Sequence, residues 1–172
     1  MNDYKTADGY GTNVFPSLLG GLNLLVLLQV GFTTQTFGVD FWEALFVALG
    51  AYWSIKGIRY IASAHDFAET KVKTQDLTDF PKKGIYSKIR HPIGAGFIYI
   101  SIGVSLLFRS AACLVVVVPI FGAAWFMLAK YQDSILVKKF DEDYIQHMDM
   151  VGMFRGKGDH TQRLQDSGYG MY

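Results

Sequence analysis

The stretch from Gly84 to Gly96 reads GIYSKIRHPIGAG and joins a charged, polar part of the chain to a long apolar run. Arg90, His91 and Pro92 stand at this junction. Proline is favoured in the first turn of a helix, where its missing N–H has no partner to lose. The stretch therefore predicts a helix that begins at Pro92. Arg90 and His91 either anchor that helix at the lipid headgroups or form part of a site.

Composition places the chain among integral membrane proteins. Its 172 residues suffice for one domain, 51% of them are hydrophobic, and only 18% are charged. Several apolar runs approach the ~20 residues that a helix needs to cross a bilayer, so we expect an all-α integral membrane fold. A net charge of +1 and the lack of a basic stripe exclude a nucleic-acid-binding protein. Cys113 is the only cysteine, so no disulfide forms within the chain, and its apolar neighbours predict a core residue.

The apolar runs predict about four transmembrane helices, followed by an amphipathic helix over a helical hairpin. We expect, in order, a polar N-terminal segment (1–16), two transmembrane helices (17–64), a polar connector that ends in the Arg-His-Pro signature (65–92), a transmembrane hairpin (93–129), an amphipathic helix (130–154) and a polar tail (155–172). Arg109 and Ser110 form the turn of the hairpin, and Pro119 is expected to kink its second helix. The N-terminal segment lacks the basic start and apolar core of a signal peptide.

The distribution of cations predicts the orientation in the membrane. Of the 16 lysines and arginines, only Arg109 falls on the far side of a four-helix arrangement. The positive-inside rule then places both termini, the connector and the signature on the cytoplasmic or matrix side. The sequence does not distinguish between the endoplasmic reticulum, a bacterial inner membrane and a mitochondrial inner membrane. Because a tight hairpin separates them, the signature and the segment after Lys130 must meet at one face.

The segment after Lys130 shows the periodicity of an amphipathic helix. Leu136, Phe140, Tyr144 and Met148 recur every four residues, and charged residues occupy the other faces. The stripe predicts packing, either against the membrane surface or back over the hairpin. The histidines show no metal-ligand spacing, with one another or with the cysteine, and no metal site is expected.

Two sequence blocks on either side of the hairpin carry a family resemblance. The first block consists of Gly84, Tyr86, Arg90-His91-Pro92 and Gly96. The second runs from Lys130 to Tyr144 and reads KYQDSILVKKFDEDY. Together they resemble the isoprenylcysteine carboxyl methyltransferase and phospholipid N-methyltransferase superfamily, whose blocks are Gly-x-Tyr-x-x-x-Arg-His-Pro-x-Tyr-x-Gly and Arg-x-Glu-Glu-x-x-Leu-x-x-x-Phe-Gly-x-x-Tyr. The resemblance covers roughly the second half of the chain.

The resemblance implies a site for S-adenosylmethionine at the polar face of the membrane. In the family the two blocks enclose this cofactor, whose amino group a carboxylate can receive. Carried over to this chain, the resemblance implies that Arg90 and His91 are catalytic, and that the cofactor is bound by Tyr86, His91, Pro92, Gly94, Gly96, Lys130 and Asp133. Asp133 would be the carboxylate and Lys130 its cationic partner. The alternative is that Asp133 and Lys130 are solvated charges at the start of a helix.

Several positions depart from the family pattern. Gly94 replaces the tyrosine of the first block. In the second block the arginine, the two glutamates and the glycine are replaced by Lys130, Gln132, Asp133 and Asp141. A lysine does not reproduce the bidentate grip of an arginine on a carboxylate. The departures fall in the blocks that form the pocket, whereas positions that support the fold match the pattern.

Two functions follow from these observations. In the first, the chain is a membrane methyltransferase that transfers the methyl group of S-adenosylmethionine to a lipid-like substrate, a prenylcysteine carboxylate or a phospholipid amine. In the second, it is a pseudoenzyme, a non-catalytic structural or accessory subunit of a larger membrane complex such as a respiratory or other energy-converting assembly, and has no cofactor. Membrane lipids are expected partners in both cases, and other membrane subunits would hold the polar termini in place.

Overall fold

The structure is a computed structural model that describes residues 14–35, 41–72 and 82–156. Its regular elements are the helices α1 (Val14–Thr34) and α2 (Phe41–Val72), a short 3-10 helix η2 (Gly84–Ser87), the helix α3 (Pro92–Leu107), a π-helical turn η3 (Cys113–Val117) and the helix α4 (Val118–Met150). Within these ranges the regular structure is helical, apart from an isolated β-bridge between Ile89 and Gly152. The predicted all-α fold is confirmed.

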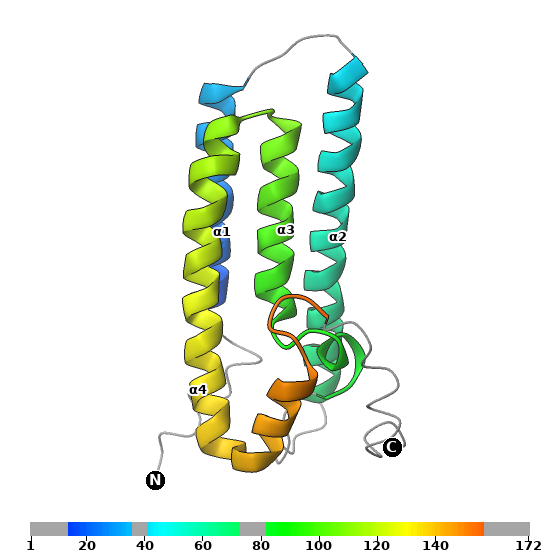
Figure 1. The fold of residues 1–172 in the computed structure, drawn as a ribbon, viewed down its shortest axis with the longest axis vertical. Coiled ribbons are helices and arrows are strands. Elements are labelled where there is room, and N and C mark those ends of the chain that lie inside the picture. The colour runs from blue at the N-terminus through cyan, green and yellow to red at the C-terminus, as the bar shows by residue number, and fades with distance from the viewer. Residues whose placement is uncertain (1–13, 36–40, 73–81, 157–172) are drawn as a thin grey trace.

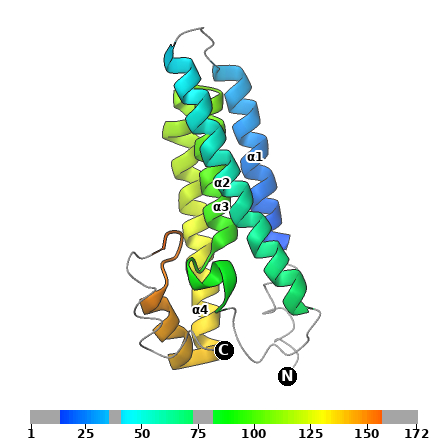
Figure 2. The same ribbon diagram turned by 90° about the vertical axis from the view of Figure 1, so that its right-hand side faces the viewer.

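The four long helices of the described chain form one elongated bundle with α3 in the middle (Figure 1). α3 contacts α1, α2 and α4, and its most extensive contact is with α2. The view from the side shows the last part of α4, in orange, turning back upward from the base of the bundle (Figure 2). This turn brings the end of α4 back toward the end of the bundle where α3 begins.

Glycines allow α2 and α3, which run antiparallel, to approach closely. Gly57 lies against α3, where an added Cβ atom would come within 2.4 Å of the carbonyl oxygen of Gly96. One heptad further along, a Cβ atom on Gly103 would lie 2.6 Å from the carbonyl oxygen of Gly50. Small residues at such positions let helix backbones touch and are typical of helix packing inside membranes.

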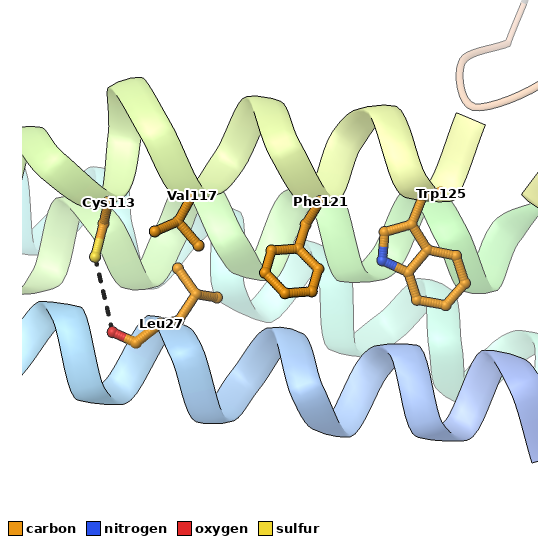
Figure 3. Packing of buried hydrophobic residues seen from close by; sticks show 5 residues of the cluster. All are labelled: Leu27, Cys113, Val117, Phe121 and Trp125. Atoms are coloured by element: carbon orange, nitrogen blue, oxygen red, sulfur yellow. Dashed lines mark hydrogen bonds between the residues drawn. The ribbon is translucent and has the colours of Figure 1, made fainter. Parts of the chain in front are cut away.

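A buried apolar cluster joins α1 to the start of α4 (Figure 3). It consists of Leu27, Cys113, Val117, Phe121 and Trp125. The thiol of Cys113 is fully buried and points to the carbonyl oxygen of Leu27, at a sulfur-to-oxygen distance of 3.7 Å. The prediction of a core cysteine is confirmed. Trp125 also stacks on Phe97 of α3, with 5.1 Å between ring centroids, so the cluster ties three helices together.

The outer surface of the bundle is strongly apolar. Exposed leucines follow one another along α1 at Leu18, Leu22 and Leu25, and further large apolar side chains cover α2 and α4. In the described part of the chain, two helical segments are long and apolar enough to cross a membrane, Phe15–Thr34 and Cys113–Met150, and α3 is a shorter apolar helix. Contiguous apolar surface of this extent suits a lipid environment.

Two helices extend further than the polarity of the sequence suggests. α2 continues through the first part of the polar connector to Val72. α4 continues without interruption past Lys130, and its 33 residues form two helical parts that meet at Asp141. This helix bends at Asp141, where φ is 45° and ψ is −123°. The kink expected at Pro119 stays a prediction; η3 interrupts the regular α-helical hydrogen bonding just ahead of this proline.

Polar side chains connect the helices in the middle and at one end of the bundle. Asn23 of α1 and Ser101 of α3 are almost fully buried and share a hydrogen bond of 3.0 Å. Arg109, in the turn between α3 and η3, has a positive φ of 49° and forms an ion pair with Glu43 of α2. This pair lies at the opposite end of α3 from the signature. The expectation that partner subunits hold the polar termini concerns mainly residues 1–13 and 157–172, which lie outside the described residues.

Candidate functional site

The signature folds into a turn that places Arg90 and His91 at the start of α3. Gly84 opens η2 with a φ of 66°, a conformation that glycine adopts without strain. Tyr86 of η2 is buried, and this burial raises the pKa of its phenol to about 12, so the phenol is neutral at physiological pH. Pro92 is the first residue of α3, which confirms the helix start predicted from the sequence.

Asp133 of α4 meets His91 in a buried contact. His91 Nε2 lies 2.7 Å from Asp133 Oδ1, and the two residues are 9% and 3% exposed. A carboxylate only accepts hydrogen bonds, so Nε2 carries a hydrogen and donates it. His91 Nδ1 lies 3.1 Å from Gln132 Oε1. The predicted meeting of the two sequence blocks is confirmed, and the alternative that Asp133 is a solvated charge is wrong.

Two further side chains surround the carboxylate of Asp133. The hydroxyl of Tyr144 donates a hydrogen bond to Oδ1 at 2.6 Å, and Arg90 Nη1 lies 3.2 Å from Oδ2. Burial alone would raise the pKa of Asp133. The hydrogen bond and charge of His91, the hydrogen bond of Tyr144 and the charge of Arg90 outweigh it, and the pKa lies below its ordinary value of 3.8. Asp133 lies beyond the apolar part of α4 and is ionised at neutral pH.

The bend at Asp141 makes the contact between Tyr144 and Asp133 possible. In a straight helix the two residues would lie about 16 Å apart along the axis. Beyond the bend, α4 folds back and its apolar stripe packs together, with Leu136 and Tyr144 buried against Phe140 and Met148. The stripe was predicted to serve packing, and this is confirmed.

We call residues 151–155 the C-terminal strap, because they lie across the start of α3 (Figure 1). The backbone N–H of Arg90 donates to the carbonyl oxygen of Gly152, and that of His91 donates to Met153, both at 3.0 Å. Val151 is 1% exposed. The strap therefore covers the signature from the side and fixes its backbone.

Phe154 of the strap fills the space beside Gly94. A Cβ atom added to Gly94 would lie 2.9 Å from Cε1 of Phe154 and 3.2 Å from Cε3 of Trp125. The rings of Phe154 and His91 are 6.4 Å apart between centroids. The family pattern has a tyrosine at position 94, whereas in this chain an aromatic ring from the strap occupies the adjacent space.

Replacing Gly94 with alanine is expected to displace Phe154 and lower the free energy of unfolding by about 1–3 kcal/mol, the usual cost of overpacking. Phe154→Leu in the same chain should recover part of this loss, because it makes room for the added methyl group. A double-mutant cycle by thermal unfolding in detergent measures the coupling. Gly21→Ala, whose Cβ meets nothing within 4 Å, is the control. Strictly additive effects would contradict the contact.

Four buried polar atoms in this region have no hydrogen-bond partner in the described chain: Arg90 Nε and Nη1, Asp133 Oδ2 and Trp125 Nε1. Arg90 Nη1 and Asp133 Oδ2 attract each other as charges at 3.2 Å without forming a hydrogen bond. Buried polar groups normally have partners, so such atoms mark a place where a ligand or water completes the network. A guanidinium beside a carboxylate suits a ligand with both a carboxylate and an ammonium group, as at the amino-acid end of S-adenosylmethionine.

The remaining predicted site residues lie outside this network. Gly96 faces α2, where an added Cβ atom would meet Ile61 and the carbonyl oxygen of Gly57. Lys130 is exposed, and its Nζ lies 5.7 Å from the ring centroid of Phe126. The cation beside Asp133 is Arg90 of the first block. Roles of Gly96 and Lys130 in cofactor binding stay predictions.

Sequence reasoning missed three residues that shape the site. Gln132 contacts His91, Tyr144 holds Asp133, and Phe154 lies beside Gly94. A tyrosine inside an apolar stripe is a usable signal, because a buried hydroxyl usually finds a hydrogen-bond partner. Phe154 gives no comparable signal, because a single aromatic residue in a glycine-rich segment fits many surroundings.

Comparison with known proteins shows the family of this chain. The model of the isoprenylcysteine carboxyl methyltransferase (ICMT) family matches residues 44–136, more than half of the chain. The chain belongs to this family. The match extends from the start of α2 into α4 and includes the signature, Gln132 and Asp133.

A curated relative supports the assignment to the isoprenylcysteine carboxyl methyltransferase family. Protein-S-isoprenylcysteine O-methyltransferase of Saccharomyces cerevisiae (strain ATCC 204508 / S288c) is 30% identical over 111 residues. These residues make up 63% of this chain and 45% of the yeast protein, so the chain spans less than half the length of that relative. Together, the family and the apolar helices identify an integral membrane protein.

Proposed function

We propose that this chain is a membrane methyltransferase that uses S-adenosylmethionine to methylate the carboxylate of a lipid-like substrate, a prenylated cysteine. The observation that carries the proposal is the buried pair of Arg90 and Asp133 beside His91, in which Nε, Nη1 and Oδ2 have no hydrogen-bond partner in the described chain. Membership of the isoprenylcysteine carboxyl methyltransferase family supports the choice of a carboxylate as the methyl acceptor.

The side chains of the site have separable roles in this proposal. Asp133 accepts the ammonium group of the cofactor, and Arg90 holds its carboxylate. His91 and Tyr144 orient Asp133 by donating to Oδ1, which leaves Oδ2 available. S-adenosylmethionine, when bound, supplies a methyl group on a sulfonium that a carboxylate can attack directly. The substrate carboxylate is already ionised at neutral pH, so the chain has to position the reactants and exclude water.

The site lies at a position along the bundle where a cofactor can enter from the aqueous phase and a substrate from the lipid bilayer. The part of α4 before the bend, residues 118–140, is about 35 Å long and slightly exceeds the ~30 Å hydrocarbon core. Asp133 lies in the polar part of this helix, next to the start of α3, whereas apolar side chains cover the bundle beyond it. A prenyl chain would lie along that apolar surface with its carboxylate at the level of the signature.

Binding of S-adenosylmethionine to the full chain in detergent or nanodiscs tests the proposal by calorimetry. We expect a dissociation constant of about a millimolar or tighter. Asp133→Asn should weaken binding at least tenfold, because it removes the charge that receives the ammonium group. His91→Ala combined with Asp133→Ala should abolish binding. The matched control is Glu142→Gln, an exposed carboxylate on the same helix, which should bind like the wild type.

Transfer of labelled methyl groups distinguishes the acceptors. A prenylated cysteine with a free carboxylate should be labelled by the wild type, and its blocked ester should not. Labelling of a phospholipid amine instead would retain methyl transfer but contradict the carboxylate as substrate. Absence of any cofactor heat well above the millimolar range would contradict the methyltransferase itself.

The position of Phe154 favours a second candidate function, a non-catalytic subunit that retains the fold. Its ring occupies the space beside Gly94, and the strap is hydrogen-bonded to the signature. If the strap covers the site permanently, the wild type will not bind S-adenosylmethionine, and Phe154→Ala will not bind it either. If the strap only covers a working site, Phe154→Ala will change the affinity for S-adenosylmethionine and leave binding measurable.

A further inference from the structure

Lys56 lies on the flank of the bundle where α2 packs against α3. Its neighbour Gly57 crosses α3 at Gly96, four residues after the start of α3 at Pro92. Lys56 is therefore about 6 Å, or one helical turn, further into the bundle than the signature. This depth is close to the polar end of the apolar surface, where lipid headgroups lie.

Aromatic rings from both helices surround the ammonium group of Lys56. Its Nζ lies 4.7 Å from the ring centroid of Trp53 and 4.6 Å from that of Tyr99. Trp53 and Tyr99 are 5.2 Å apart between centroids, and Tyr60 lies 5.4 Å from Tyr99. All four side chains are half-buried. The ammonium group is thus folded over two rings of a partly open cluster, which fixes its position.

The cation has no acidic partner in the described part of the chain. The ion pairs there join Arg90 and His91 to Asp133, and Arg109 to Glu43. Contacts with ring faces stabilise the ammonium group of a lysine, and its N–H donors can still reach a ligand. These donors can therefore bind an external anion that lies at the same depth.

The two tyrosines bring phenol hydroxyls to the same cluster. The hydroxyls of Tyr60 and Tyr99 add donors that can serve the same oxygen-rich ligand.

We propose that Lys56, held over Trp53 and Tyr99 with Tyr60 beside them, binds the phosphate of an anionic bilayer lipid on the α2–α3 flank. A phosphate offers several oxygens to an ammonium and two hydroxyls at once. The alternative headgroup feature, a quaternary ammonium, is disfavoured because Lys56 already occupies the ring faces that would receive it. This lipid site is separate from the methyltransferase site and does not depend on catalysis.

Native mass spectrometry of the full chain from nanodiscs of mixed phosphatidylglycerol and phosphatidylcholine tests the proposal. The wild type should retain phosphatidylglycerol in preference to phosphatidylcholine. Lys56→Gln should reduce the preference about fivefold, the ratio that corresponds to roughly 1 kcal/mol for a cation near a membrane surface. Lys56→Arg should restore most of it, and Tyr99→Phe should reduce it less than Lys56→Gln does.

Arg59→Gln is the matched control. Arg59 is an exposed cation of α2, one turn from Lys56, and its substitution removes the same charge. It should keep the preference within twofold of the wild type. An equal loss in Arg59→Gln, or an unchanged preference in Lys56→Gln, would overturn the proposal. Displacement of the lipid by millimolar inorganic phosphate would assign the site to a soluble anion instead. Circular dichroism shows whether each variant is folded. If Lys56→Gln does not fold, Tyr99→Phe still tests the proposal.

Discussion

Replacing Gly103 with alanine is expected to lower the free energy of unfolding by about 3 kcal/mol or more, at the upper end of overpacking costs. The added methyl group would lie 2.3 Å from Ser54 Oγ and 2.6 Å from both the backbone nitrogen of Ser54 and the carbonyl oxygen of Gly50. Two of these three atoms belong to the backbone of α2. They cannot rotate away as a side chain can, so α2 and α3 would have to separate along the whole contact.

Unfolding in mixed micelles, followed by circular dichroism, measures this effect. Gly122→Ala is the control, because its added Cβ atom meets nothing within 4 Å. It should be neutral or stabilising by up to about 1 kcal/mol, since alanine favours a helix more than glycine does. Equal losses in Gly103→Ala and Gly122→Ala would show that α2 and α3 do not pack through this glycine.

Replacing Asp133 with alanine is expected to destabilise the chain by about 3–5 kcal/mol, the range for breaking a buried ion pair on one side. The substitution leaves Arg90 and His91 buried without their carboxylate and removes the acceptor of the Tyr144 hydroxyl. Thermal unfolding in detergent measures the loss. Gln132→Ala, which removes a half-buried contact to the same histidine, should cost less than half as much. Comparable losses in the two variants would contradict a central role for the carboxylate.

The pH dependence of stability gives a second measurement on Asp133. Its pKa is lowered in the folded chain, so the carboxyl group contributes stability that is fully present above its ordinary value of 3.8. This contribution is lost as the pH falls below 3.8 and through the folded pKa. Asp133→Asn should be less stable at neutral pH and should lack this part of the acid loss. A variant that keeps the wild-type profile below pH 3.8 would assign the loss to other groups.

Much of the site was predictable because each of its two halves is a continuous stretch of sequence. Pro92 marked the start of α3, and the hairpin placed the signature next to the segment that contains Asp133. The cation beside Asp133 was not predictable, because Arg90 and Lys130 both lie close to it in the expected topology. Only the orientation of the side chains, Arg90 inward and Lys130 outward, decides between them.

The helix ends and the strap were less predictable, for physical reasons. α2 continues to Val72 because the polar connector contains good helix formers and no glycine or proline in that part. Asp141 bends α4 although aspartate rarely adopts a positive φ, so the bend has no strong local signal apart from the glycine of the family pattern. The strap is fixed by hydrogen bonds between residues 90–91 and 152–153, some 60 positions apart, and such pairing leaves no periodicity in the sequence.

The position of Tyr144 beyond the bend has a consequence for biosynthesis. Arg90, His91 and Asp133 are all present once the ribosome has made the apolar helices, but the hydroxyl that holds Asp133 and the strap that covers His91 are synthesised later. In the two-stage description of membrane protein folding, helices enter the bilayer before they assemble. The apolar helices are therefore made before Tyr144 and the strap, and these later segments complete and close the site.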